Sequence, residues 1–424
     1  MTLLVFLEVM GKDILVGRIT GTSSEDACFA YDEEYMSVPE HRPISIALPF
    51  TDEPYSPAKT KCFFDGLLPE GYTRRCVAGE LHVDEQDYIS LLEILGDECL
   101  GAIRILNEEA EIPSASYKEL SDEQLKRFAL EGSEESAVLV TKSHLSLTGA
   151  SGKTGLYYSE ADDKWYMPVG SAPSTHIVKQ SHVRLGRIVA NEQLSLMTAS
   201  KLGIQIPESF VVSLDGVGSE SALFATKRYD RKQGKGKLID GLQAPYRLHQ
   251  EDFAQALGIQ AGFKYEKSGG NYLERMMRLL ANYSSNPIED QLRLWDICLF
   301  NYFLGNTDNH IKNLSLLYSE DMKKIRLSPA YDLVSTLVYK SSTDEMALSI
   351  DGVYTISNIT RDSFKREAAK DGLGVGIAMA HFDHMRSEFE NALLTSAEEL
   401  ISQGIDGVSY VADDILRVFR SRFK

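Results

Sequence analysis

The chain has 424 residues, 43% hydrophobic and 25% charged, a composition typical of a globular protein with a large core. Its net charge of −18 disfavours direct binding to nucleic acid, which depends on cationic neutralisation of phosphates. No run of about 18 apolar residues predicts a membrane helix. The five cysteines include no C-x-x-C pair, so we expect reduced thiols, a cytoplasmic location and no membrane contact.

The first quarter of the chain, residues 1–106, alternates short strands, turns and helices. Alternating apolar residues predict a β-hairpin from residues 3–9 and 13–20. A short amphipathic helix is predicted over residues 86–95. This part is therefore expected to be rich in β-structure.

The rest of the chain changes character twice. Residues 107–135 are acidic and polar, which indicates a linker with one helix over residues 116–130. Residues 136 to about 270 mix strands and helices, and the remainder is mostly helical. The expected fold class is therefore α+β.

A polar loop is predicted between a buried helix and a hairpin. Residues 288–304 are apolar on nearly every face, as in a buried helix, and Gly305 is a plausible end for it. Two strand-like runs, 314–318 and 325–327, predict the hairpin. The segment N-T-D-N-H-I-K-N (306–313) lies between this helix and the hairpin. A rigid core would thus present its polar side chains, as in many active sites.

The loop carries Asp308 and, five positions later, Asn313, while Asp332 follows the hairpin. Protein kinases use this order of groups: one aspartate orients the attacking hydroxyl, and the asparagine and a later aspartate hold magnesium. No HRD or DFG is present, so a kinase with this loop is an atypical one. The spacing alone is also typical of a structural turn, because Asp and Asn side chains cap nearby backbone groups.

A second loop, residues 146–154, is a candidate cover for phosphates. It carries Gly149, Gly152 and Lys153, but Leu147 stands where a Walker A motif requires glycine. We interpret it as a different glycine-containing phosphate loop. A flexible hairpin tip is the alternative.

The candidate phosphate lysine is Lys179, at the end of a strand-like run over residues 174–179. Kinases hold the α- and β-phosphates with a lysine in such a position. Glu192, on a helix predicted over residues 188–202, is a candidate partner for it. The alternative is a solvated strand lysine.

Two further segments are candidates for nucleotide contacts. A strand over residues 222–226 runs into an exposed segment, 227–231, where a kinase hinge would contact adenine through backbone groups. Gln250 begins another predicted helix and is a candidate to reach the cleft. A polar residue at a helix start, without such a contact, is the alternative.

Taken together, these segments resemble the HipA family of bacterial serine/threonine kinases, the toxins of HipBA-type toxin–antitoxin systems. The resemblance covers nearly the whole chain and rests on short motifs in a fixed order: S-I-A-L-P (45–49), F-F-D-G-L-L-P-E (63–70), G-D-E-C-L-G-A (96–102), T-H-I-V-K (175–179), R-Y-D-R (228–231), H-Q-E-D (249–252), K-Y-E (264–266), N-T-D-N-H-I-K-N (306–313) and L-S-P-A-Y-D (327–332).

The resemblance implies an atypical, kinase-like fold with two lobes. Residues 1–106 would form a small β-rich N-terminal subdomain and residues 107–135 an acidic linker with a helix. Residues 136–247 would form a part similar to a kinase N-lobe, with the phosphate loop and the ATP lysine. Residues 248–424 would form a helical C-lobe that carries the catalytic and metal-binding loops.

The resemblance also implies a role for each matching residue. Asp308 would be the catalytic aspartate, and Asn313 and Asp332 would bind magnesium. The nucleotide would contact Lys179, Lys153 with the loop of Gly149 and Gly152, Tyr229, Asp230 and His310, and Gln250 stays the candidate that its position suggested. Ser146 matches the serine that family members autophosphorylate, which expels the loop and switches the kinase off, and Thr148 offers a second hydroxyl nearby.

The implied function is an ATP- and magnesium-dependent protein serine/threonine kinase, the toxin of a toxin–antitoxin system. Its substrate would be an aminoacyl-tRNA synthetase, best known for glutamate (glutamate–tRNA ligase), so that phosphorylation arrests translation. A HipB-like helix-turn-helix antitoxin would be its partner, and DNA would be reached only through that partner. The alternatives are a non-catalytic module that binds the antitoxin and assists repression, and a kinase fold that transfers AMP or phosphorylates a small molecule.

Overall fold

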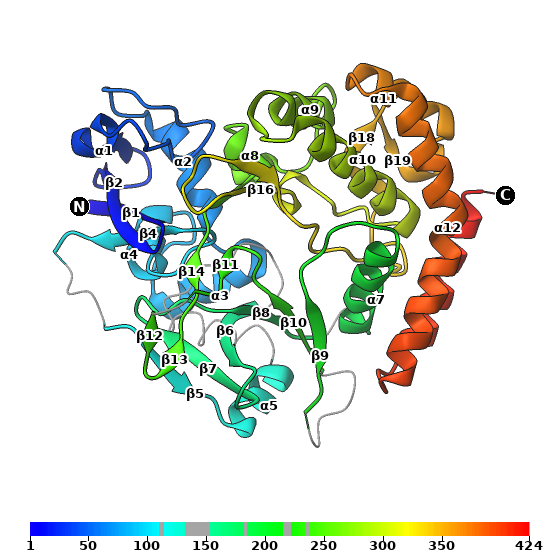
Figure 1. Cartoon of the computed structure of the whole chain (residues 1–424), viewed down its shortest axis with the longest axis horizontal. Coiled ribbons are helices and arrows are strands. Elements are labelled where there is room, and N and C mark those ends of the chain that lie inside the picture. The colour runs from blue at the N-terminus through cyan, green and yellow to red at the C-terminus, as the bar shows by residue number, and fades with distance from the viewer. Residues whose placement is uncertain (110–113, 132–152, 182–184, 215–221, 235–236, 424) are drawn as a thin grey trace.

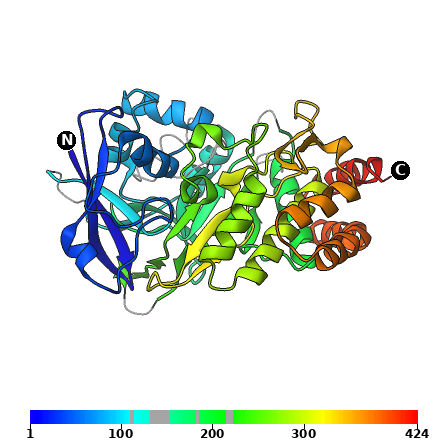
Figure 2. The same cartoon turned by 90° about the horizontal axis from the view of Figure 1, so that it is seen from above.

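The computed structural model describes residues 1–109, 114–131, 153–181, 185–214, 222–234 and 237–423. Figure 1 shows the N-terminal part of the chain and the long C-terminal helices at opposite ends of an elongated molecule, with the chain termini far apart. Figure 2 shows the same separation from above. None of the helices within the described ranges is long and apolar enough to cross a membrane.

The N-terminal part is built on a four-stranded antiparallel sheet in the order β3–β2–β1–β4. The predicted hairpin is present, because β1 pairs with β2 from Thr2 with Thr20 to Val9 with Lys12. The strands are β1 (Thr2–Val9), β2 (Lys12–Thr20), β3 (Cys28–Tyr31) and β4 (Ile103–Asn107), and the helices are α1 (Glu33–Ser37), α2 (Pro57–Phe64), α3 (Gly71–Leu81) and α4 (Tyr88–Leu95).

A six-stranded antiparallel sheet in the order β5–β7–β6–β8–β10–β9 follows. It places Lys179, at the end of β8, beside Lys153, at the start of β6. The strands are β5 (Ser116–Glu119), β6 (Lys153–Ser159), β7 (Lys164–Val169), β8 (His176–Lys179), β9 (Ser209–Val212) and β10 (Leu223–Lys227), with helices α5 (Asp122–Glu131) and α7 (Ile188–Lys201).

Two predictions of local structure are wrong here. Of the helix predicted over residues 116–130 only the second half is present, because Ser116–Glu119 pairs with β7 as an edge strand and the following helix packs Phe128 into the core of the sheet. Gln250 lies in a strand and not at a helix start, since it pairs with Leu317. The boundaries of the four predicted parts stay predictions.

The C-terminal part is mostly helical, as predicted. Its long helices pack around α10 and carry the largest share of the core. The helices from α8 to the C-terminus are α8 (Phe253–Ala256), α9 (Tyr272–Tyr283), α10 (Pro287–Leu304), α11 (Arg361–Lys370), α12 (Val375–Ser402) and α13 (Val408–Ser421). The short strands that follow β10 are β11 (Arg231–Lys232), β12 (Leu238–Ile239), β13 (Leu242–Gln243), β14 (Tyr246–Arg247), β15 (Gln250–Asp252), β16 (Ser315–Tyr318), β17 (Ile325–Leu327), β18 (Glu345–Ile350) and β19 (Val353–Thr355).

The buried helix α10 delivers the polar loop to the centre of the molecule. Gly305 ends it with a left-handed φ of +75°, and a Cβ there would lie 2.7 Å from Val418 Cγ1. Glycine therefore satisfies both the turn and the close contact. The loop then enters the three-stranded sheet β15–β16–β17, which contains the predicted hairpin.

A buried cluster of charges joins the N-terminal part to the rest of the chain. Glu98, between α4 and β4, accepts hydrogen bonds from Arg231 Nη2 at 2.7 Å, Arg228 Nη1 at 3.3 Å and Arg247 Nε at 2.9 Å. Asp230 and Glu8 complete the cluster with ion pairs to these arginines. The positive charges of the three arginines are balanced by the negative charges of the three carboxylates, although burial is unfavourable for each charged group alone.

We expect the Glu98→Ala variant to lose about 3 kcal/mol or more of unfolding free energy, because it leaves buried arginines without a partner. Urea unfolding checks this expectation. Glu108→Ala, at an exposed glutamate of the same part of the chain, is the control. An equal, small effect in the two variants would contradict the role assigned to the cluster.

Asp371, at the end of α11, gives a second prediction about stability. Burial and the nearby Glu367, whose carboxylate lies within hydrogen-bonding reach, raise its pKa to about 8. The folded protein thus holds a proton that the unfolded chain releases near pH 4. The contribution of Asp371 to folding stability should fall as the pH rises from about 4 to about 8, and its penalty should be complete above that range.

The Asp371→Asn variant removes this ionisation. We expect it to melt at a higher temperature than wild type at pH 8.5, by an amount equivalent to at least about 1 kcal/mol, and to melt like wild type at pH 4. Thermal unfolding at both pH values tests this. A gain of the same size at pH 4 would show that the effect does not come from ionisation.

Candidate active site

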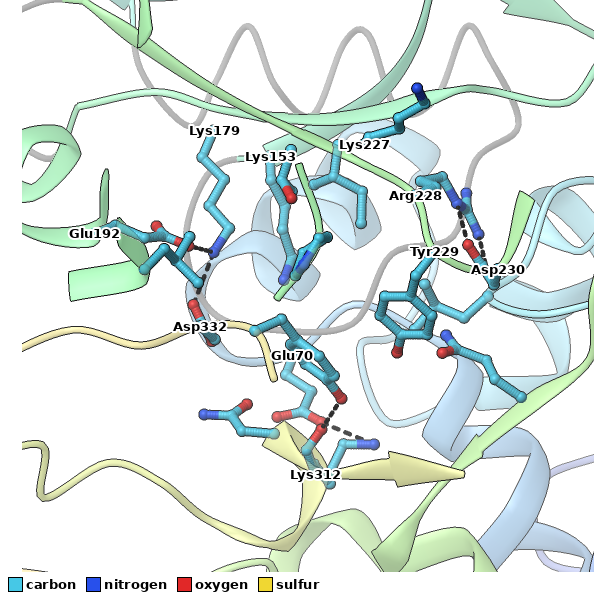
Figure 3. A pocket seen from close by; sticks show the side chains of 18 of the residues that line it. Glu70, Lys153, Lys179, Glu192, Lys227, Arg228, Tyr229, Asp230, Lys312 and Asp332 are labelled. Atoms are coloured by element: carbon cyan, nitrogen blue, oxygen red, sulfur yellow. Dashed lines mark hydrogen bonds and ion pairs between the residues drawn. The ribbon is translucent and has the colours of Figure 1, made fainter. Parts of the chain in front are cut away.

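One pocket lies where the six-stranded sheet, the loop after α10 and the N-terminal part meet (Figure 3). Each of these three regions contributes polar side chains to its wall. The lining residues are Glu70, Leu100, Lys153, Ile177, Lys179, Glu192, Leu196, Pro207, Thr226, Lys227, Arg228, Tyr229, Asp230, Gln250, His310, Lys312, Asn313, Tyr331 and Asp332.

Lys179 stands between two carboxylates, as Figure 3 shows. Its Nζ is 2.6 Å from Glu192 Oε1 and 2.7 Å from Asp332 Oδ1. The ion pair predicted between Lys179 and Glu192 is therefore present. Burial alone would raise the pKa of Asp332, but Lys179 and Lys153 hold it well below its usual range. Asp332 is thus an anion aimed at the same space as two cations.

Lys153 is the second cation of the pocket. It is the cross-strand partner of Lys179 in the register of β6 and β8, so both side chains leave the same face of the sheet. Burial and the positive charge of Lys179 lower the pKa of Lys153 to about 8. Two ammonium groups held this close favour a polyanion, which would restore the full charge of Lys153.

The loop after α10 is fixed through its asparagines. Asn306 accepts a hydrogen bond from Asp308 N at 3.0 Å and donates one to Asn301 on α10 at 2.7 Å. Asn313 Nδ2 donates to the backbone carbonyl of Asp308 at 3.1 Å, and its amide oxygen accepts no hydrogen bond from the described residues, so this oxygen can face a cation. The Asp308 carboxylate accepts a 2.6 Å hydrogen bond from the Tyr265 hydroxyl.

Aromatic and polar side chains line the opposite end of the pocket. Tyr229 stacks against Tyr331 with ring centroids 5.7 Å apart. The carboxylate of Asp230 lines the pocket but is held by Arg228 and by the backbone N–H of Gly101. Asp230 would therefore contribute to a nucleotide site by shaping the pocket wall.

Several buried polar atoms of the pocket lack partners among the described residues. They include Gln250 Oε1 and His310 Nδ1. Burial lowers the pKa of His310 to about 3, so the ring is neutral near pH 7 and keeps one donor and one acceptor. Buried polar atoms of this kind are normally satisfied by a ligand or by water.

These residues fit ATP with magnesium. The phosphates match the two lysines, and Asp332 with the Asn313 amide supplies the hard oxygen ligands that magnesium prefers. In the described residues no group of three His, Cys, Asp and Glu side chains could hold a metal. One carboxylate completed by phosphate oxygens is a usual way to bind magnesium.

Four predicted residues lie outside the described residues. They are Ser146, Thr148, Gly149 and Gly152, all in the loop before β6. Lys153 is the first described residue of the predicted loop and the first residue of β6.

The site contains residues that were not predicted as members of it, and two of them, Glu70 and Tyr265, make contacts that bear on its geometry. Glu70, in the N-terminal part, reaches the pocket and pairs with Lys264 at 2.6 Å and with Lys312 at 3.4 Å. Tyr265 reaches Asp308. Both belong to motifs visible in the sequence, F-F-D-G-L-L-P-E and K-Y-E, but contacts over 194 and 43 residues leave no local signal.

Comparison with known proteins gives two family matches, one in the N-terminal part of the chain and one over the region that contains the pocket lysines and the Asp308 loop. The family model described as HipA N-terminal domain matches residues 7–106, and the HipA-like C-terminal domain matches residues 145–399. The putative kinase Y4mE of Sinorhizobium fredii is 29% identical over 419 residues, 96% of each protein. The serine/threonine-protein kinase toxin HipA of Shewanella oneidensis is 26% identical over 383 residues, 87% of this chain and 83% of the relative.

A solved structure agrees with the fold. A chain in the Shewanella oneidensis complex of HipA, HipB and operator DNA matches with a TM-score of 0.79 and 22% identity, over 98% of this chain and 96% of its own length. The fold is thus the α+β, two-lobed, kinase-like fold that the sequence predicted. Because the C-terminal family model alone matches more than half of the residues, the chain belongs to the HipA family.

Proposed function

We propose that this protein is an ATP- and magnesium-dependent protein serine/threonine kinase. The observation that supports this most is the arrangement of Lys153, Lys179, Asp332 and Asn313 around one pocket, with Asp308 on the same loop as Asn313. The kinase names of its relatives point in the same direction.

In this mechanism Asp308 orients the acceptor hydroxyl and takes its proton as the oxygen attacks the γ-phosphorus. A new O–P bond forms, the bond to the β–γ bridging oxygen breaks, and ADP leaves with that electron pair. Lys179 and Lys153 align the phosphates and neutralise their charge. Asp332 and Asn313 would hold magnesium, which supplies further neutralisation when bound. Gln250, His310 and the wall formed by Tyr229 and Asp230 would hold the nucleoside.

The physiological role we propose is that of a cytoplasmic toxin. Its relative from Shewanella oneidensis is named a toxin, and the matching solved structure contains HipB and operator DNA. We propose a HipB-like helix-turn-helix antitoxin as partner and contact with DNA only through it, in keeping with the net charge of −18. The proposed substrate is an aminoacyl-tRNA synthetase, with glutamate–tRNA ligase first, and the proposed control is autophosphorylation of Ser146 or Thr148.

Intact-mass and phosphopeptide spectra after incubation with ATP and magnesium test the proposal. We expect one or more phosphates on the chain, none when EDTA replaces magnesium, and a phosphate on added glutamate–tRNA ligase but not on a second synthetase. A product with the mass of AMP would replace kinase chemistry by adenylylation. Nucleotide binding with no transfer to either protein would favour the non-catalytic interaction module.

A further inference from the structure

The side chain of Asp308 depends on one residue for its orientation. Asn306 and Asn313 hold the backbone of Asp308, whereas the Tyr265 hydroxyl donates to Oδ1 at 2.6 Å. Within the described part of the chain, no other side chain hydrogen-bonds to this carboxylate. Because Oδ1 is taken, the second oxygen, Oδ2, remains for an acceptor hydroxyl.

Tyr265 in turn is held by its two neighbours in the chain. Lys264 Nζ forms an ion pair with Glu70 at 2.6 Å, and Glu266 is buried and accepts a hydrogen bond from Ser349 N at 2.8 Å. The Tyr265 ring also stands edge-on to His310, with centroids 5.1 Å apart. These contacts support the position of Tyr265, a residue that is 46% exposed.

Glu70 connects this tyrosine segment to the catalytic loop. It precedes α3 in the N-terminal part. Its Oε2 forms an ion pair with Lys264 at 2.6 Å, and its Oε1 forms a longer ion pair, of 3.4 Å, with Lys312, the neighbour of Asn313. Figure 3 shows Glu70 and Lys312 in the pocket wall. Lys312 is buried and also pairs with Asp252 at 2.5 Å. Burial alone would raise the pKa of Glu70, but Lys312 and Lys264 lower it to about 2, so the carboxylate stays charged.

We infer that Glu70, Lys264 and Tyr265 form a positioning relay that orients Asp308 toward the acceptor hydroxyl. The inference rests on the proposed kinase function and assigns the N-terminal part of the chain a share in the catalytic site. A partly buried glutamate that bridges the tyrosine segment and the catalytic loop ties both to one anchor. Catalysis needs such an anchor, since a misplacement of about 1 Å can lower a rate by about a hundredfold.

The Tyr265→Phe variant tests the first contact, because it keeps the ring and removes only the hydroxyl. We expect the maximal rate of phosphate incorporation from ATP and magnesium to fall by about ten- to a hundredfold. The ATP concentration for half-maximal rate and the affinity for ATP should stay within about twofold of wild type. Tyr283→Phe, at an exposed tyrosine on α9, is the matched control. Either of two results would overturn the relay: an unchanged rate in Tyr265→Phe would mean that the hydroxyl does not position Asp308, and a higher rate would mean that it blocks Asp308.

The Glu70→Gln variant tests the anchor, with Glu80→Gln on the exposed side of α3 as control. We expect a lower maximal rate together with equal or tighter ATP binding, because the change removes a negative charge from a pocket for a polyanion. General loss of folding would lower both quantities. The double variant Glu70→Gln with Tyr265→Phe should have nearly the same maximal rate as the less active of the two single variants, because both changes interrupt one relay. Independent, multiplying losses would overturn the relay.

Melting temperatures separate this inference from the proposed function. If wild type binds ATP but transfers no phosphate, the kinase proposal fails and the relay is judged by its contacts alone. If the two side chains interact, the sum of the melting-temperature shifts of the single variants Tyr265→Phe and Asp308→Asn should exceed the shift of the double variant. Fully additive shifts would show that the two side chains do not interact, and would overturn the inference.

Discussion

Replacing Asp308 with alanine should lower the rate of phosphate transfer by roughly a hundredfold to ten thousandfold, the usual contribution of a general base. ATP affinity should stay within about twofold of wild type. The reason for this difference is geometric: Lys153, Lys179 and Asp332 line the pocket, whereas the Asp308 carboxylate lies outside that lining and bonds only Tyr265 among the described residues.

Phosphate incorporation over time and nucleotide titration measure the two effects separately. Asp413→Ala, at an exposed aspartate on α13 far along the chain from the pocket residues, is the control. Full activity in Asp308→Ala would remove this residue from the mechanism. Loss of ATP binding together with activity would instead assign Asp308 to the nucleotide site.

The parts of the site that could be predicted are those with strong local signals. The continuous apolar pattern of α10, ended by Gly305, and the hairpin β16–β17 placed the Asp308 loop correctly. Alternation and β-branched residues gave the strand of Lys179, and the following helix α7 brought Glu192 to it. Each of these elements is fixed by the hydrophobic period of a few consecutive residues.

The remaining parts depend on contacts between distant segments. Ser116–Glu119 has no apolar alternation, and it forms a strand only because β7 offers an open edge. Gln250 is a strand residue because β16 pairs with it. The placement of Glu70 beside Lys264 and Lys312 requires the docking of the N-terminal part, which rests on buried charges such as Glu98. No pattern within one segment encodes such a contact.

The Asp332→Asn variant should abolish most of the effect of magnesium on ATP binding. Asp332 supplies the one carboxylate of the proposed magnesium site, and an amide is a much weaker ligand for a hard cation. We expect ATP affinity in the presence of magnesium to fall by about tenfold or more, and phosphate transfer to fall with it. Without magnesium, affinity should be equal to or tighter than that of wild type, because Lys179 loses its 2.7 Å ion pair with Asp332 and is free for the phosphates.

Asparagine is the right replacement because Asp332 has a φ of +57°. Asn and Asp tolerate this left-handed conformation better than other residues with a side chain, so the backbone should be retained. Asp163→Asn is the matched control, since Asp163 also has a positive φ, of +52°, and accepts one hydrogen bond from Tyr158. Calorimetric titration of ATP with magnesium and with EDTA gives both affinities. If the variant keeps the magnesium dependence of wild type, Asp332 serves as the partner of Lys179 and not as a metal ligand, because loss of a metal ligand lowers the affinity only in the presence of magnesium.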